Sequence, residues 1–226
     1  MPKISRLDLL SGRPRISACR VVLLVLVVTV VTGCAFGQKI SYTGVSSFSV
    51  PENTPKKVGL AVSDKRPDVV ADDHSLQWVG YSRPPLGIPY GVHTESGRPL
   101  VDDLASLLES SLAVHHIVAQ TVTTQPFEDR QVIVARVISN QNARNFIFTL
   151  NDWHTDSYVG LIASLHYSVN LEVVDASGRT LGVASSVGVK SLSASYPLSS
   201  AVSDIFNALF NAEQISSVVA SGAGAK

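Results

Sequence analysis

Two short clusters of carboxylate and imidazole side chains are of the types that could bind a metal ion. One is three consecutive residues, and the other is a D-x-H-x-D pattern, whose alternation places all three side chains on one side of an extended segment. Neither cluster has a further ligand at a spacing typical of a metal-binding family. We interpret both as solvated acidic segments and predict neither a metal ligand nor a cofactor. The clusters are Asp72, Asp73 and His74, and Asp152, His154 and Asp156.

Motifs of known catalytic chemistry are missing from the sequence. No nucleophile elbow of the form G-x-S-x-G occurs, the nearest string being "GYSRP", and phosphate loops, H-E-x-x-H and C-x-x-C are also missing. His115 and His116 follow a helical pattern, so we interpret one of them as an imidazole near a helix C-terminus, stabilised by the helix dipole. The sequence therefore predicts no catalytic residue and no enzyme.

Three aromatic residues, Trp78, Tyr81 and Tyr90, alternate with prolines in the segment from Pro67 to Pro99. Aromatic side chains are enriched at binding hot spots, so these three are candidate partner-binding residues. The alternative is that they hold a long loop against a sheet. At about thirty residues the segment is too long for a plain connection, and we expect an ordered surface loop there.

A cysteine closely follows an aliphatic run near the start of the chain. The first twenty residues carry five Lys and Arg side chains against Asp8, and Val21 to Val31 is an apolar run of eleven residues broken by Thr29. That length fits a secretory signal of roughly 7–15 apolar residues and is shorter than the roughly 20 needed to span a bilayer. The sequence predicts a signal peptide over residues 1–33.

The four residues Val31, Thr32, Gly33 and Cys34 resemble the bacterial lipobox. The resemblance implies that a lipoprotein signal peptidase recognises the first three and cuts before Cys34, whose thiol carries diacylglycerol. Two or more acyl chains make a stable membrane anchor, whereas one holds a protein only marginally. Ala35 stands where an Asp would be the familiar inner-membrane retention signal, so the resemblance implies the outer membrane, on its periplasmic side.

Removal of the leader changes the charge and the thiol content of the chain. Taking five cations and one anion from eighteen of each leaves thirteen and seventeen, a net charge near −4, with no basic stripe that would suggest nucleic acid. Cys19 leaves with the leader, so the remaining domain contains no disulfide partner for Cys34.

Hydrophobic periodicity divides the remaining chain into strands and two helices. We predict a lipidated N-terminus and tether over residues 34–57, a strand from Val58 to Ser63, and a helix starting at Leu100 with leucines at helical spacing. A second helix follows Pro197. Strands are predicted in "HHIVAQTVTT", "RQVIVARVIS", residues 161–173 and the segment after "DASGR", where a hairpin turn is expected at Gly178.

Alternation from Leu161 to Val173 is the clearest in the chain, with Leu165 on the apolar side and His166 on the polar side. In the next strand we expect Leu181, Val183, Val187 and Val189 to point inward. A sheet that is apolar on one face is covered on one side. The predicted fold is therefore α+β, a two-layer sandwich in which two helices cover one face of a mainly antiparallel sheet, forming a single domain over 58–216 with a flexible tail over 217–226.

Four segments of this domain resemble the YajG-type family of bacterial lipoproteins over about Val58 to Phe210. The resemblance implies a compact α/β envelope domain without assigned catalytic residues, and no site residue is transferred from it. It favours a non-enzymatic, lipid-anchored envelope protein that binds another envelope component. The alternative is a lipoprotein that holds a lipid or cell-wall fragment between sheet and helices. The segments are "VGLAVSDKR", "LVDDLASLLESSL", "DWHTDSYVG" and "HYSVNLEVVDASGRTLG".

Overall fold

The structure is a computed structural model that describes residues 38–43, 47–84, 88–158 and 162–220. The chain divides into two compact units, residues 1–36 and 37–226, and every described residue belongs to the second. The expected signal peptide and its residues Val31, Thr32, Gly33 and Cys34 lie outside the described residues.

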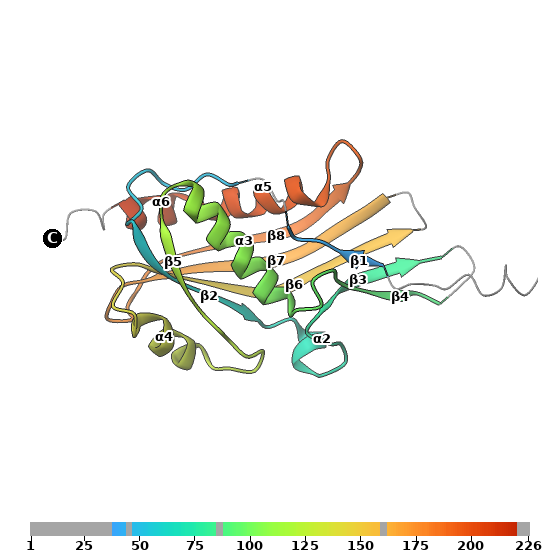
Figure 1. The fold of residues 1–226 in the computed structure, drawn as a ribbon, viewed down its shortest axis with the longest axis horizontal. Helices are drawn as coiled ribbons and strands as arrows, with labels where there is room; N and C mark the ends of the chain where they lie inside the picture. The colour runs from blue at the N-terminus through green and yellow to red at the C-terminus, as the bar shows by residue number, and fades with distance from the viewer. Residues whose placement is uncertain (1–37, 44–46, 85–87, 159–161, 221–226) are drawn as a thin grey trace, which may run out of the picture. The chain divides into compact units, whose positions relative to one another are not determined.

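The described unit contains strands and helices in mixed order (Figure 1). The strands are β1 (Lys39–Ile40), β2 (Lys57–Asp64), β3 (Trp78–Arg83), β4 (Tyr90–Thr94), β5 (Val118–Val122), β6 (Asn145–Tyr158), β7 (Ile162–Val174) and β8 (Thr180–Leu192). The helices are α2 (Pro67–Val70), α3 (Leu100–Val114), α4 (Arg130–Ile138), α5 (Leu198–Phe210) and α6 (Glu213–Ala220).

All the described strands form one mixed sheet built around β6. One edge of β6 pairs first with β2 and then, further along, with β3, while its other edge pairs with β7. The pairs β1/β4, β2/β5, β2/β6 and β3/β6 are parallel, and β3/β4, β6/β7 and β7/β8 are antiparallel. The prediction of a mainly antiparallel sheet is wrong, because crossovers through α3 and α4 return the chain to the same end of the sheet before β5 and β6.

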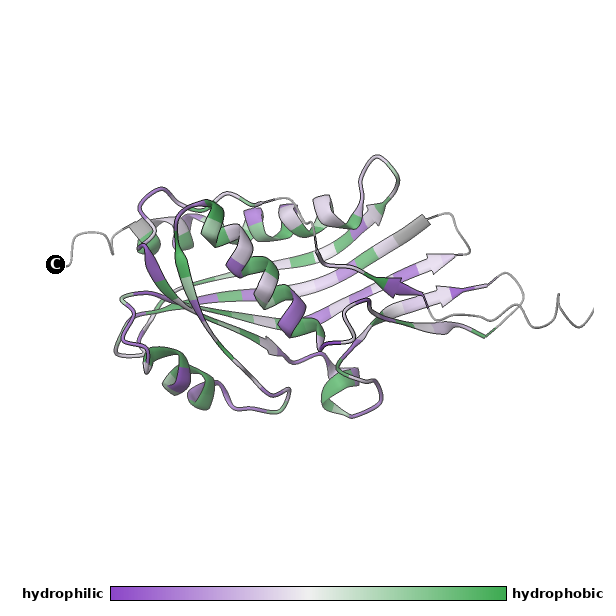
Figure 2. Ribbon diagram, in the orientation of Figure 1, coloured by the Kyte–Doolittle hydropathy of each residue, from purple (hydrophilic) through white to green (hydrophobic). Residues whose placement is uncertain are grey.

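Helices α3, α5 and α6 cover one face of the sheet, here called the inner face (Figure 1). The predicted helices after Pro99 and Pro197 are confirmed, and their apolar residues are buried. Figure 2 shows hydrophobic and hydrophilic residues alternating along both helices. The core between these layers includes Leu104, Leu108, Phe206 and Phe210, all essentially inaccessible to water.

Helix α4 lies on the opposite face of the sheet, so the prediction that helices cover one face alone is wrong. Its segment, "RQVIVARVIS", was expected to be a strand because β-branched residues favour strands. Ile133, Val134 and Val137 instead share one side of a helix and pack on Ala61 and Ile147 of the sheet. Helical spacing of the apolar residues outweighs β propensity here.

Strand β7 follows the predicted alternation, and β8 departs from it. Leu165, Val169 and Leu171 are buried on the inner face, as expected. In β8, however, the pairing with β7 shifts between Val173 and Val174, whose partners are Gly182 and Thr180, leaving Leu181 as an extra residue. A bulge of one residue reverses the direction of every later side chain. The prediction that Val183, Val187 and Val189 point inward is therefore wrong, since all three are exposed.

The segment from Pro67 to Pro99 is not the expected surface loop. It contains α2 and the antiparallel pair β3/β4, which extends the sheet beside β6. Val79 and Val92 from this pair belong to the main core. The region expected to be a tether is also packed in part, because Tyr42 and Phe48 are buried against the inner-face helices and the sheet.

The predicted turn at Gly178 between β7 and β8 is confirmed. Gly178 has a φ of 82°, a conformation that glycine adopts without strain. The carboxylate of Asp175 accepts hydrogen bonds from the backbone N–H groups of Ser177 and Arg179, at 2.9 and 3.1 Å. The turn is thus organised by one side chain.

Candidate functional site: an open sheet face and its edge strand

The outer face of the sheet carries a row of stacked rings where α4 does not cover it. Trp78 of β3 stacks on His154 of β6 with ring centroids 6.0 Å apart, and His154 stacks on His166 of β7 at 4.6 Å. His74, which precedes β3, stacks on the other side of Trp78 at 4.2 Å. The row crosses three strands, so it ties the two halves of the sheet together. We call His74, Trp78, His154 and His166 the ring row.

Hydrogen bonds fix the orientation of the three histidine rings. Nε2 of His74 lies 2.7 Å from the hydroxyl oxygen of Tyr81, whose ring meets Trp78 edge-on at 5.2 Å. Nδ1 of His154 lies 2.7 Å from a carboxylate oxygen of Asp152, and Nε2 of His166 lies 3.2 Å from the hydroxyl of Ser164. The ring row is therefore preorganised, and Tyr81 contacts two of its members, His74 and Trp78.

A buried ion pair, Arg66 with Asp64, contacts the ring row at Trp78. The Nε and Nη2 groups of Arg66 donate to the two carboxylate oxygens of Asp64, at 2.9 and 2.7 Å, and both side chains are 2 % exposed. Nη1 of Arg66 donates to the backbone carbonyls of Trp78 and Trp153, joining β3 to β6. The guanidinium carbon lies 5.7 Å from the centre of the Trp78 ring. Such a charged pair is tolerated in the interior because its hydrogen-bonding groups have partners.

Strand β8 forms the edge of the sheet next to the ring row. It is 13 residues long and pairs with β7 alone among the described strands. Val183, Val187 and Val189 project from its outer face and are 46 %, 70 % and 57 % exposed. Val189 is the pairing partner of His166, so the valines continue the row of rings to the edge. We call these three residues the valine stripe.

The candidate metal clusters do not assemble into a site. His74 contacts Tyr81, and Asp156 accepts two hydrogen bonds from Nε of Arg83, at 2.7 and 3.0 Å, rather than joining Asp152 and His154. Among the described residues, no group of three or more His, Cys, Asp or Glu side chains could hold a metal ion. His115 and His116 directly follow the last residue of α3. Nε2 of His115 lies 2.9 Å from the carbonyl oxygen of Phe48.

Of the three aromatic residues proposed as partner-binding, two lie together. Trp78 is 3 % exposed and Tyr81 is half-buried beside it, whereas Tyr90 is exposed on β4 opposite Ser82. The sequence reasoning missed His154 and His166 as neighbours of Trp78. Their alternation within β6 and β7 was a visible signal of a shared face, but the pairing of β3 with β6 was not.

The space between the inner face and its helices is filled by packed rings. Phe48 stacks on Phe210 at 5.2 Å, and Phe146 and Phe148 meet Phe210 edge-on. Burial raises the pKa of Tyr42, whose hydroxyl accepts a hydrogen bond from Nε1 of Trp153. This packing opposes the alternative expectation of a ligand held between sheet and helices.

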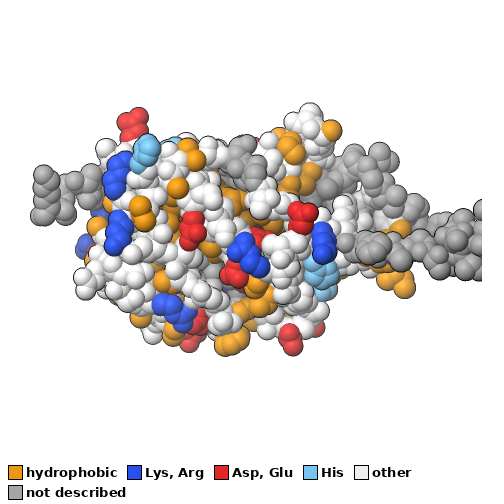
Figure 3. Space-filling view, in the orientation of Figure 1, with side chains coloured by type: hydrophobic (Ala, Val, Ile, Leu, Met, Phe, Trp, Pro, Cys, Tyr) orange, Lys and Arg blue, Asp and Glu red, His pale blue; other side chains and the backbone are white. Residues whose placement is uncertain are grey.

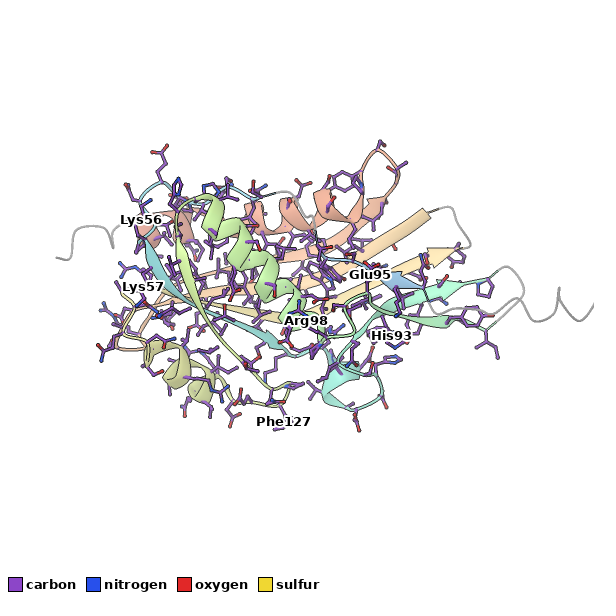
Figure 4. All side chains as sticks on the ribbon, viewed as in Figure 1. Lys56, Lys57, His93, Glu95, Arg98 and Phe127 are labelled. Carbon is purple, nitrogen blue, oxygen red and sulfur yellow. The ribbon has the colours of Figure 1, made fainter. Side chains whose placement is uncertain are left out.

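A pocket of about 250 Å³ lies beside α3, with Tyr42 in its lining. Its lining includes the hydroxyls of Thr43, Ser106 and Ser110, and the ion pair of Arg98 with Asp103. Figure 4 shows Arg98 at the start of α3, near His93 and Glu95.

The surface on the α3 side shows no concentration of one charge. Figure 3 shows Lys and Arg side chains interspersed with Asp and Glu on this face. Across the described residues, no helix combines the length and the apolar character that a bilayer crossing requires.

Comparison with known proteins finds no family model and no curated sequence that matches this chain. The solved structures to which it is similar include protein XCC0632 from Xanthomonas campestris, of family DUF330, with 11 % identity, a TM-score of 0.42 and coverage of 81 % of this chain and 91 % of that one. A PelC dodecamer from Paraburkholderia phytofirmans has 11 % identity, a TM-score of 0.37 and coverage of 80 % and 96 %. Lipoprotein GNA1162 from Neisseria meningitidis has 18 % identity, a TM-score of 0.31 and coverage of 68 % and 96 %. TM-scores of this size establish no shared function.

Proposed function

We propose that this chain is a lipid-anchored protein of the bacterial cell envelope that binds another envelope protein and has no catalytic activity. The proposal includes acylation of Cys34 and location at the periplasmic side of the outer membrane. The observation that supports partner binding is the valine stripe on β8, an edge strand of 13 residues. The bound segment would be an extended strand of the other protein, added to the sheet along β8.

Edge strands present unpaired backbone N–H and C=O groups, and a partner strand satisfies them. Natural sheets protect such edges with charged side chains, especially lysine. The exposed outward positions of β8 hold valine and serine, while Lys190 points the other way and is paired with Asp204. The edge therefore lacks the usual protection where the valine stripe lies.

The ring row supplies a rigid surface beside that edge. A partner strand on β8 would place its outward side chains next to Val187 and Val189, with His166 one strand further in. Because the rings are already fixed by stacking and hydrogen bonds, ordering them on binding costs little conformational entropy. Tyr81 and the exposed edge of this row would contribute contacts, while Trp78 supports them from within the sheet.

The anchor is supported by the sequence alone. Cys34 follows a basic segment, an apolar run and two small residues, and the domain that follows holds no further cysteine. A Cys34→Ser variant should lose metabolic labelling with an acyl probe and remain as uncleaved precursor. Labelling of the variant would contradict the proposed anchor.

Partner binding is tested by site-specific photo-crosslinking in intact cells that express the full chain. A photoreactive amino acid at Ser185, between Val183 and Val187, should give an adduct of defined mass. Val187→Lys in the same protein should remove most of the adduct, because a buried ammonium opposes strand addition. The matched control is Val114→Lys on α3, where Val114 is 62 % exposed, and it should leave the adduct unchanged.

Three results would oppose the proposal. An unchanged adduct in the Val187→Lys variant would exclude β8 as the contact. An equal loss in the Val114→Lys variant would show a general effect on the protein. An adduct with twice the mass of the chain would show that the protein binds a second copy of itself rather than another protein.

A further inference from the structure

We infer that one end of the sheet, where β3, β4 and β6 meet, rests directly on the lipid surface. The contact is made by Ile88, Tyr90 and Tyr158, with Arg83 beside Tyr158 and Lys39 further along, opposite His93 of β4. This inference rests on the acylation of Cys34 proposed above and adds which part of the domain meets the bilayer.

The length of chain before the described domain sets how far the domain can stand from its anchor. Gln38 is the first described residue, and Cys34 precedes it by four residues. Four residues reach at most about 14 Å when fully extended. An acylated Cys34 lies at the membrane surface, so the neighbourhood of Gln38 must lie close to that surface.

Gln38 is held in place by the sheet. Its carbonyl oxygen accepts a hydrogen bond from the N–H of His93 on β4, and its side-chain oxygen accepts one from the hydroxyl of Ser157 on β6, at 3.2 Å each. The adjacent strand β1 runs parallel to β4, with Lys39 paired to His93. The chain thus enters the domain beside Ser157, next to the last residue of β6, and beside His93, three residues after Tyr90 on β4.

Exposed apolar side chains are gathered at this same end. Ile88 is 84 % exposed and precedes β4 by two residues, Tyr90 begins β4 and is 45 % exposed, and Tyr158 ends β6 and is 62 % exposed. Tyr90 pairs with Ser82, and Tyr158 pairs with Arg83, the next residue of β3. Since consecutive residues of a strand point to opposite faces, the two tyrosines flank the end of the sheet on both sides.

The chemistry of these residues fits a lipid headgroup region. Tyrosine is enriched where membrane meets water, because its ring is apolar and its hydroxyl is polar. Arg83 is 39 % exposed and Lys39 is exposed, and cations near anionic lipid phosphates favour association. This end is therefore apolar, with the ion pair of Arg83 and Asp156 at the strand ends and Lys39 further along beside β4, although the mature chain as a whole is anionic.

The end-on contact also leaves the proposed partner site accessible. The ring row and the valine stripe lie on the outer face and the β8 edge, and the row meets β3 at Trp78, the end of that strand opposite to Arg83. A domain that rests on its strand ends would direct β8 along the membrane normal, toward the periplasm. Binding to lipid and binding to a partner strand would use different parts of the sheet.

The test uses the mature acylated protein reconstituted in vesicles of phosphatidylethanolamine and phosphatidylglycerol. The acylated chain has no other thiol, so a single introduced cysteine can carry a fluorophore. Labels at Ile88→Cys and at Phe127→Cys are compared for quenching by lipids brominated near the headgroup. Phe127 is 77 % exposed on the connection from β5 to α4, away from the labelled His93 end of β4 (Figure 4).

Quenching at residue 88 should exceed quenching at residue 127 by several-fold. Adding Tyr90→Ser and Tyr158→Ser should remove at least half of the quenching at residue 88. The control pair Val114→Ser and Val132→Ser, also exposed valines on helices, should leave it unchanged. Equal quenching at the two labels, or quenching that survives loss of both tyrosines, would overturn the inference.

The mass of the reconstituted protein separates this inference from the proposed function. Protein without acyl chains on Cys34 would refute the anchor. A Cys34→Ser form of the Ile88→Cys protein, made from residue 34 onward, labelled and added to preformed vesicles, would then still report whether residue 88 meets lipid. Acylated protein whose residue 88 stays unquenched would keep the anchor and refute the lipid-facing end.

Discussion

His154 and His166 stack face to face across β6 and β7, with ring centroids 4.6 Å apart and ring planes 7° from parallel. Each ring has its own polar partner, Asp152 for His154 and Ser164 for His166. The two residues are also direct pairing partners in the sheet. The stack therefore couples two strands through side chains as well as through the backbone.

A double-mutant cycle measures this coupling. We expect His154→Ala and His166→Ala each to lower the free energy of unfolding, and the double variant to lose less than the sum of the two. The difference should be about 0.5–1.5 kcal/mol, the range for an aromatic pair beyond its buried area. Urea unfolding of the four proteins gives the number, and strictly additive losses would show that the rings touch without stabilising each other.

The ion pair of Arg66 and Asp64 provides a second prediction. Arg66→Met should lower the free energy of unfolding by about 3–5 kcal/mol, because it leaves the Asp64 carboxylate buried without its cation. Arg179→Met is the matched control, since Arg179 also pairs with an aspartate but its side chain is 76 % exposed, and should cost about 0–1 kcal/mol. Similar losses in the two variants would mean that Asp64 gains water or another partner when Arg66 is removed.

The β3/β4 pair should be necessary for folding, which reverses the expectation for a surface loop. Replacing residues 77–95 with a Gly/Ser linker would remove Val79 and Val92 from the core and would leave Thr155 to Tyr158 of β6 unpaired on the edge that β3 occupies. We expect the variant to lose its cooperative thermal transition. A substitution of Ile88→Ser, at an exposed position of the same segment, should leave that transition in place. If the linker variant still unfolded cooperatively, the β3/β4 pair would not be required for folding of the domain.

Sequence reasoning located the elements whose periodicity is unambiguous. The leucines of α3 and the alternation of β7 each require one covered face, whatever the rest of the chain does. It failed for α4, where β-branched residues fit strand and helix alike, and for β8, where a single extra residue at Leu181 reversed the valines. The parallel pairing of β3 with β6 joins residues about seventy-five positions apart, and no local pattern in either strand specifies it.

The same limit applies to the candidate site. Trp78 and Tyr81 could be chosen from the sequence because aromatic residues in a proline-rich segment are conspicuous. Their neighbours His154 and His166 could not, since the stack depends on which strands meet. The valine stripe was visible as an apolar alternation, but its direction depends on the bulge and hence on tertiary pairing.

The turn at Asp175 gives a prediction for the dependence of stability on pH. The hydrogen bond from the Ser177 hydroxyl, with those from the backbone, lowers the pKa of Asp175 from 3.8 to about 2. A carboxylate with a lowered pKa in the folded state stabilises the protein above its unfolded pKa, and this contribution disappears as the pH falls through the folded pKa. The contribution of Asp175 should thus be complete above about pH 4 and decline between about pH 4 and pH 2.

Asp175→Ala isolates that contribution, because other carboxylates titrate equally in both proteins. Near pH 6 the variant should be less stable by about 1–3 kcal/mol, the range for hydrogen bonds to a charged group. The difference between the two proteins should shrink as the pH is lowered from 4 to 2. Ser177→Ala, which removes one donor and keeps the carboxylate, should show a smaller loss and move the decline toward higher pH. A difference between native protein and Asp175→Ala that stays constant from pH 6 to pH 2 would mean that the turn is held by its backbone alone.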